Sequence, residues 1–224
     1  MNTPTKFIED LEVGQSKTLL VYGTSLSFHL APLLRTALRS RYEDRVTVIN
    51  SGMSATASRT GMQELEKKVL QHQFDALLLE FAVNDAYNYE DYPDDSLDKG
   101  ISLSESRENL EYIIEHVQKA WPDCEIILQT MNPTYDAANS EAFAGSRRPD
   151  LDRYYDVYRS VARERNLLLI DNTAMWNVIA LGEPERFQEL IPDGAHPTPA
   201  AIRSLLVPHL LSELGIEHSD PNVF

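Results

Sequence analysis

Residues 18–27 read TLLVYGTSLS, a short apolar run that passes directly into a polar turn. The apolar part, 18–22, is continuous rather than alternating, which indicates a strand buried on both faces, as in a parallel sheet. Four further runs rich in Leu, Ile and Val have the same character. They lie at 46–50, 76–81, 125–130 and 167–171.

Stretches with helical periodicity separate these runs, at 30–38, 63–70, 103–120, 151–165 and 199–214. Strands that alternate with helices of this length imply right-handed crossovers between parallel strands. Start and stop signals agree, since Ser102 or Ser104 can cap the helix at 103–120 and Gly215 can end the last one. The sequence therefore predicts an α/β fold, a three-layer α/β/α sandwich around a five-stranded parallel sheet.

The composition of the 224 residues, 42% hydrophobic and 25% charged, is that of an ordinary globular protein. We expect one domain over 1–224, with an N-terminal extension at 1–16 and a tail at 216–224. The net charge of −15 argues against a nucleic acid or an anionic membrane as partner, because clustered Lys and Arg support binding to both.

The single cysteine, Cys124, excludes an intramolecular disulfide, so nothing in the sequence requires an oxidising compartment. Residues 1–14 lack the continuous apolar segment of a signal peptide, and no run reaches transmembrane length. A cytoplasmic protein is the default expectation.

Three candidate residues follow the first three predicted strands within a few positions. Ser25 could act as a nucleophile, although serine at this place is also a routine helix N-cap. Gly52 could offer a backbone N–H that an oxyanion approaches closely, or simply form a tight turn. Asn84 could donate from its side-chain amide, or bond its own backbone. Because ligands of an open parallel sheet bind at the carboxyl ends of its strands, the three converge on one rim if the strands are neighbours.

Asp193 and His196 lie three residues apart in a turn bounded by Pro192 and Pro197. The carboxylate could accept a hydrogen bond from Nδ1 of the imidazole, which leaves Nε2 free to take a proton. An ordinary loop histidine before a helix is the alternative, and His29 is a weaker competitor for the role of base. Because the chain has no HxH, HExxH or CxxC spacing, we predict no metal site.

Two long irregular segments, 86–100 and 131–150, follow predicted strands, and loops of this length are usually functional or mobile. Their tyrosines suit the walls of a sugar site and suit packing within the loops equally well. These tyrosines are Tyr87, Tyr89, Tyr92 and Tyr135. The pair Arg147-Arg148 could contact an anionic group, although a solvated surface pair is favoured. Asp85 is expected to face a loop rather than a reacting atom.

Four short blocks of this chain resemble those of the SGNH hydrolase superfamily, the GDSL-like esterases and lipases. GTSL at 23–26 is similar to the GDSL block, and the glycine, asparagine and Asp-x-x-His blocks follow in the family's order at Gly52, Asn84 and 193–196. Thr24 stands where the signature has Asp, and Ala82 stands where the asparagine block commonly opens with Gly. These two departures bear on loop shape and substrate range more than on the chemistry.

The resemblance implies a flavodoxin-like sandwich and a Ser-His-Asp triad that requires no metal or organic cofactor. In that triad Ser25 is the nucleophile, His196 is the base and Asp193 is the partner of the base. The resemblance further implies an oxyanion hole formed by the N–H groups of Ser25 and Gly52 and by the amide of Asn84.

We therefore predict a carboxylic ester hydrolase that acts through an acyl-enzyme on small acyl esters, either short-chain or carbohydrate O-acetyl esters. The expected partner is a small-molecule or carbohydrate ester. An acyltransferase of the same superfamily would use the same triad and stays open. A flavodoxin-like module that cradles a phosphate or a flavin on GTSLS is a further alternative, and it would leave Asp193 and His196 without a role.

Overall fold

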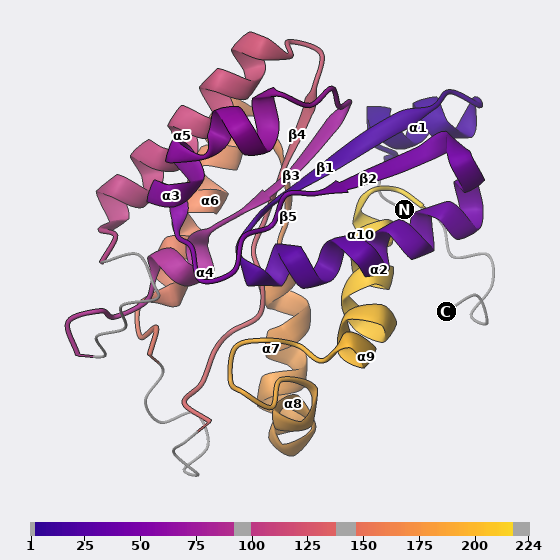
Figure 1. The fold of residues 1–224 in the computed structure, drawn as a ribbon. Helices are drawn as coiled ribbons and strands as arrows, with labels where there is room; N and C mark the ends of the chain where they lie inside the picture. The colour runs from indigo at the N-terminus through magenta and orange to yellow at the C-terminus, as the bar shows by residue number, and fades with distance from the viewer. Residues whose placement is uncertain (1–2, 92–99, 138–146, 217–224) are drawn as a thin grey trace.

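Five parallel strands pair in the order β2-β1-β3-β4-β5 in the computed structural model, which describes residues 3–91, 100–137 and 147–216 (Figure 1). The α/β fold with a five-stranded parallel sheet is thereby confirmed. Each predicted run differs from its strand by at most one residue at either end. The strands are Lys17–Gly23 (β1), Val46–Asn50 (β2), Ala76–Glu80 (β3), Glu125–Gln129 (β4) and Leu168–Ile170 (β5).

The strand order reverses between β1 and β3. From β1 the chain crosses to β2 on one side, and it then returns past β1 to add β3, β4 and β5 on the other side. This is the flavodoxin-like order, in which the connections on the two sides of the reversal leave the sheet in opposite directions. In folds of this order ligands bind at the carboxyl ends of the strands beside the reversal, which here are β1 and β3.

Helices cover both faces of the sheet (Figure 1). On one face lie α3 (Ser58–Gln63), α5 (Leu103–Ala120) and α6 (Leu151–Arg165), with α5 in contact with both of the others. On the other face α2 (Ser25–Tyr42) packs on β1 and β2 and contacts α10 (Val207–Glu213). The shorter elements are α1 (Lys6–Glu12), η1 (Glu43–Arg45), η2 (Glu66–Leu70), α4 (Ala82–Asp85), α7 (Asn172–Gly182), α8 (Pro184–Leu190), α9 (Pro199–Ala201) and η3 (Ile202–Leu206).

Helices α5 and α6 have the bounds that the periodicity predicts, but the other predicted helices differ from the structure. Helix α2 begins at Ser25 instead of residue 30, because the Thr24 side chain accepts from the Leu26 N–H and caps the helix there. The helix predicted at 63–70 is divided between α3 and η2. The one predicted at 199–214 is interrupted by η3, a stretch of π-helix.

The predicted N-terminal extension contains helix α1, which packs into the core. Phe7, Ile8 and Leu11 form its buried face. The backbone N–H of Phe7 donates to Glu125 Oε2 at 2.9 Å, which ties the helix to the start of β4. The segment therefore contributes to the core that supports the sheet.

We expect Phe7→Ala to lower the free energy of unfolding by about 3 kcal/mol, because the substitution leaves a cavity in the core. Val13→Ala is the matched control, since Val13 lies just after α1 with 74% of its surface exposed, and it should change stability by less than about 0.5 kcal/mol. Urea unfolding of both variants measures the difference. Equal stabilities for the two variants would contradict the packing of α1 described above.

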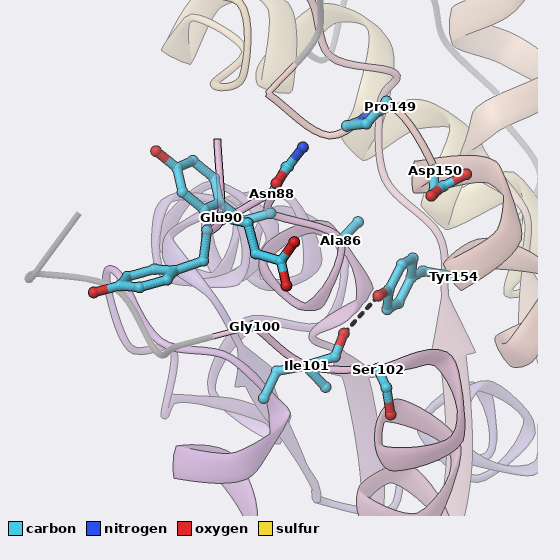
Figure 2. Close-up of a pocket in the computed structure, with 11 residues that line it drawn as sticks. Ala86, Asn88, Glu90, Gly100, Ile101, Ser102, Pro149, Asp150 and Tyr154 are labelled. Atoms are coloured by element: carbon cyan, nitrogen blue, oxygen red, sulfur yellow. Dashed lines mark hydrogen bonds between the residues drawn. The ribbon is translucent and has the colours of Figure 1, made fainter. Parts of the chain in front are cut away.

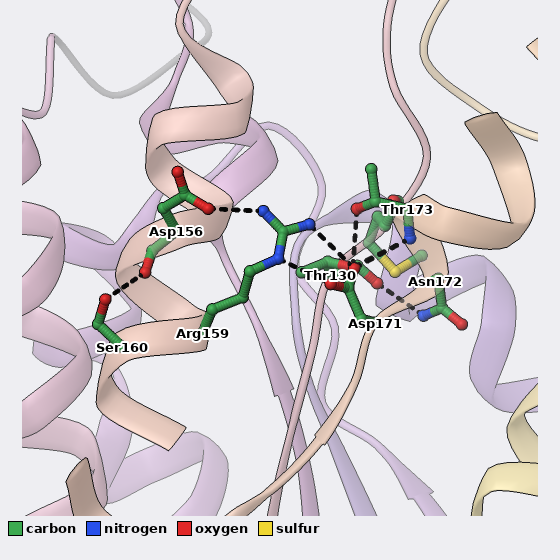
Figure 3. A network of polar contacts seen from close by, with 8 residues as sticks. Thr130, Asp156, Arg159, Ser160, Asp171, Asn172 and Thr173 are labelled. Atoms are coloured by element: carbon green, nitrogen blue, oxygen red, sulfur yellow. Dashed lines mark hydrogen bonds and ion pairs between the residues drawn. The ribbon is translucent and has the colours of Figure 1, made fainter. Parts of the chain in front are cut away.

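A polar network fixes the carboxyl ends of β4 and β5 (Figure 3). Arg159 of α6 donates to both oxygens of Asp171, from Nε at 2.7 Å and from Nη2 at 3.1 Å. Asp171 also accepts from the Thr130 hydroxyl at 2.7 Å and from the Thr173 N–H at the start of α7. Burial by itself would raise the pKa of Asp171, but the bonds from Arg159 and Thr130 outweigh it and lower that pKa. The ionised carboxylate thus joins α6 to the start of α7.

Candidate active site

The candidate residues Ser25, Gly52 and Asn84 follow three strands that are neighbours in the sheet. Ser25 is the first residue of α2, Gly52 follows β2, and Asn84 lies in α4 just after β3. Parallel neighbours end at the same edge, so the structure brings the three residues to one rim of the sheet. The condition that the sequence left open, that these strands be neighbours, is met.

Ser25, His196 and Asp193 form a continuous series of hydrogen-bonding contacts. Ser25 Oγ lies 2.8 Å from His196 Nε2, and His196 Nδ1 lies 2.7 Å from Asp193 Oδ2. Donation from Nδ1 to the carboxylate leaves Nε2 as the acceptor for the serine hydroxyl. Burial tends to raise the pKa of Asp193, but hydrogen bonds from the His196 and Ala195 backbone N–H groups and the His196 ring outweigh it and lower that pKa.

The loop that carries Asp193 and His196 is held by the segment that follows β4. Tyr135 donates its N–H to Gly194 O at 2.9 Å and its hydroxyl to Ile191 O at 2.6 Å. Asn132 donates to Ala195 O at 2.9 Å. Gly194 has φ +80°, and a Cβ there would lie 2.0 Å from the Tyr135 carbonyl oxygen. Sequence reasoning did not single out Gly194, although a glycine between Asp and His is a signal for such a turn.

The side-chain amide of Asn84 is oriented from both ends. Its Nδ2 donates to Thr56 O at 2.9 Å, and its Oδ1 accepts from Arg148 Nη2 at 3.1 Å. An amide nitrogen carries two hydrogens, so one remains for a ligand. Arg148 therefore departs from the favoured prediction of a solvated pair: it is half-buried and contacts a candidate site residue, whereas Arg147 is exposed.

Gly52 has a packing role that explains its lack of a side chain. A Cβ at this position would lie 2.4 Å from the backbone nitrogen of Phe28 in α2. Its own N–H donates to Asn50 Oδ1 at 3.1 Å. A ligand would therefore share this N–H with Asn50, so Gly52 is a weaker candidate donor than Asn84.

A buried carboxyl group, Glu80 at the end of β3, anchors the turn that carries Ser25. Its Oε1 accepts from the N–H and hydroxyl of Thr24, both at 2.8 Å, and from the hydroxyl of Ser27 at 2.9 Å. A Cβ on Gly23 would lie 2.6 Å from the same oxygen. Oε2 has no hydrogen-bond partner among the described residues, and burial raises the pKa of Glu80 to about 7 despite the bonds to Oε1.

We expect Glu80 to make stability depend on pH. Because its folded pKa is raised from 4.5 to about 7, the protonated form is favoured by folding, and stability should fall as pH rises through this range. A change of that size corresponds to about 3 kcal/mol. Glu80→Gln keeps an acceptor oxygen but cannot ionise, so its stability should lack this decline.

Urea unfolding of wild type and Glu80→Gln from pH 4.5 to 8 gives the test. The difference between the two proteins isolates Glu80, since the contribution of Asp85 is common to both. Parallel stability curves would show that Glu80 does not titrate with a raised pKa.

Asp85 is buried instead of facing a loop, which corrects the expectation from the sequence. Its Oδ1 accepts from the Ser58 N–H at 2.7 Å, and its Oδ2 accepts from the Ser106 hydroxyl. Burial raises the pKa of Asp85 to about 6, against the lowering effect of these bonds. The side chain joins α4 to α3 and α5.

A cavity of about 600 Å³ lies beside α4, between the starts of α5 and α6 (Figure 2). The Arg148 guanidinium lies over the ring of Tyr87, with Cζ 5.3 Å from its centroid, and so links this cavity to Asn84. Tyr135 is engaged in packing the His196 loop, and Tyr92 lies outside the described residues. The cavity lining includes aromatic and acidic residues: Tyr87, Tyr89, Glu90, Asp150 and Tyr154.

A second hollow, of about 400 Å³, borders His196. Its lining is mainly apolar and includes His29, Leu33, Pro192 and Ile202. The ring of His29 lies 6.1 Å from that of His196, centroid to centroid, and Ser25 Oγ is in contact with His196. The imidazole within hydrogen-bonding distance of Ser25 Oγ is therefore that of His196.

Residues 20–203 match the model of the GDSL-like Lipase/Acylhydrolase family. The chain belongs to this family. As a GDSL-like acylhydrolase it is a carboxylic ester hydrolase, which favours the enzyme over the flavodoxin-like binding module. A comparison with curated proteins gives no match.

Solved structures share the fold of this GDSL-like chain over nearly its whole length. The acetylxylan esterase Axe2 from Geobacillus stearothermophilus is 24% identical, covers 93% of this chain and 99% of its own, and has a TM-score of 0.74. LAE5, an α/β hydrolase enzyme from the metagenome of Lake Arreo, Spain, is 23% identical with coverages of 92% and 98% and a TM-score of 0.72. A mutant of Axe2 is 26% identical with coverages of 91% and 96% and a TM-score of 0.72.

Within residues 3–91, 100–137 and 147–216 of this GDSL-like chain, no group of three or more His, Cys, Asp or Glu side chains is arranged to hold a metal ion. In the same ranges, no helix combines the length and the apolar character needed to cross a bilayer.

Proposed function

We propose that this carboxylic ester hydrolase is a serine esterase in which Ser25 is the nucleophile, His196 the base and Asp193 the group that orients and stabilises the base. The observation that carries the proposal is the pair of contacts at 2.8 Å and 2.7 Å that joins the three side chains. The lowered pKa of Asp193 supports it, because an ionised carboxylate stabilises the imidazolium that forms during the reaction.

The reaction has two steps. His196 Nε2 takes the hydroxyl proton of Ser25 as Oγ attacks the acyl carbon, and the imidazolium then returns the proton to the leaving alkoxide. Water next attacks the acyl-enzyme, gives a proton to His196 and releases the acid, after which Ser25 regains its proton. The Ser25 N–H at the start of α2 and the free Nδ2 hydrogen of Asn84 stabilise the oxyanion, with a smaller contribution from Gly52.

We propose short acyl groups on carbohydrates, O-acetyl esters above all, as the substrates. The cavity beside α4 supports this assignment, because tyrosine rings and carboxylates suit the faces and hydroxyl groups of a sugar. A neighbour in structure is an acetylxylan esterase. Rates on acetyl and octanoyl esters of one alcohol test the acyl part, with a preference for acetyl expected. A preference for octanoyl would refute it.

Labelling with a fluorophosphonate probe, followed by peptide mapping, tests the nucleophile without requiring the natural substrate. We expect one modified serine, Ser25, and loss of labelling in His196→Ala because the hydroxyl is then no longer activated. Modification of Ser27 in place of Ser25 would contradict the assignment.

A further inference from the structure

One arginine holds the segment that carries Asn84 at three points. Arg148 Nη2 donates to Asn84 Oδ1 at 3.1 Å, and Arg148 Nε donates to Val83 O at 2.5 Å. The guanidinium also lies over the ring of Tyr87. These contacts reach from the end of the 131–150 segment to α4 and to Tyr87, two residues beyond it. One side chain thus holds both the Val83 carbonyl and the Asn84 amide.

The contacts at the amide of Asn84 determine which way it points. A guanidinium can only donate, and a backbone carbonyl can only accept. Arg148 therefore requires the oxygen of the amide on its side, and Thr56 O requires the nitrogen on the other. With the amide so fixed, the second Nδ2 hydrogen is available to the site. A reversed amide would present its oxygen and repel an oxyanion.

The positive charge of Arg148 also favours donation from the amide nitrogen of Asn84. Burial lowers the pKa of Arg148, yet an arginine keeps its proton at any pH of interest. A positive charge on Oδ1 draws electron density through the amide and strengthens Nδ2 as a donor, and this effect is larger where water is excluded. Asn84 itself is only 7% exposed.

We propose that Arg148 is a positioning residue of the oxyanion site, which acts by orienting and polarising the amide of Asn84. The proposal rests on the proposed function, because it assigns Arg148 a role only if Asn84 stabilises an oxyanion. It predicts a loss in kcat with little change in KM, since the amide contacts the transition state more strongly than the bound ester.

A double-mutant cycle in kcat on p-nitrophenyl acetate gives the test. We expect Arg148→Met to lower kcat by roughly 10- to 100-fold, as when groups that orient a catalytic ligand are removed, and Asn84→Ala to lower it by about 10² to 10³. If Arg148 acts through Asn84, the double variant should match Asn84→Ala within about twofold. Losses that multiply in the double variant would overturn the proposal.

Arg147→Met is the matched control, because it removes the same charge from the neighbouring, exposed position. We expect its kcat to stay within about twofold of wild type, and an equal loss for both arginines would overturn the proposal in favour of a general charge effect. Melting temperatures identify a variant that is merely unfolded. If Arg148→Met is unfolded, the cycle is built with Arg148→Lys. A double variant that matches Asn84→Ala then supports the proposal, and losses that multiply overturn it.

The cycle also separates this proposal from the proposed function. Asn84→Ala with the kcat of wild type would remove the oxyanion role of Asn84 and both proposals with it. The other outcome is an Asn84→Ala variant with a low kcat that falls further, by the full factor of Arg148→Met, in the double variant. That result would leave the proposed function standing and refute only the role of Arg148.

Discussion

Ser25→Ala should lower kcat on a short acyl ester by about 10⁶, the scale seen when the nucleophile of a serine triad is removed. The substitution deletes the only atom that would bond to the acyl carbon, and His196 then has no hydroxyl to deprotonate. The fold should persist, because Ser25 Oγ contacts the imidazole and supports no other element through a described hydrogen bond. Steady-state kinetics with a matched melting curve measure both effects.

Ser27→Ala is the control for this experiment. Ser27 lies two residues further along α2, and its hydroxyl donates to Glu80 instead of His196. We expect it to lose some stability and to keep at least a tenth of the wild-type kcat, since the anchoring bonds from Thr24 remain. A Ser25→Ala enzyme with more than about a hundredth of the wild-type kcat would mean that another group attacks the ester.

Asp193→Asn should lower kcat at neutral pH by about 10⁴, because the amide imposes the wrong tautomer on His196. In wild type, Asp193 Oδ2 accepts from Nδ1 and Oδ1 accepts from the Ala195 and His196 N–H groups. An asparagine can keep the two backbone bonds only by turning its NH₂ toward Nδ1. Nε2 then carries the hydrogen and cannot accept the proton of Ser25.

The control for this substitution is Asp171→Asn, whose carboxylate pairs with Arg159 and caps α7 away from the site. It should lower the melting temperature with little change in kcat. The opposite pattern, with Asp193→Asn unstable but active, would show that Asp193 merely holds its loop.

The sequence predicted the sheet well because buried parallel strands are continuous apolar runs, a signal that needs no knowledge of neighbours. The candidate triad and oxyanion donors could also be selected from the sequence, since each residue follows a strand or lies in a turn bounded by prolines. Helices α5 and α6 were predicted with their true ends because each has an apolar stripe with a polar remainder.

Other elements carried no such local signal. Helix α7 reads NTAMWNVIALG and is apolar around most of its circumference, so no period distinguishes it. The role of Glu80 depends on bonds to Thr24, which lies 56 positions away, and that of Arg148 depends on Asn84, which lies 64 positions away. Secondary-structure propensities carry no information on such long-range contacts. Charged residues are usually exposed, and this general tendency favoured the wrong prediction for Arg148.

The contact between Ser25 and His196 joins residues 171 positions apart, one from the beginning of the sheet and one from beyond its last strand. If the two residues act together as proposed, a refolding or newly synthesised chain can gain most of its secondary structure before it turns over substrate. Enzyme activity should appear last, after the far end of the polypeptide has docked. The rate of ester cleavage should therefore report the completion of folding, because partly folded intermediates would contribute no activity.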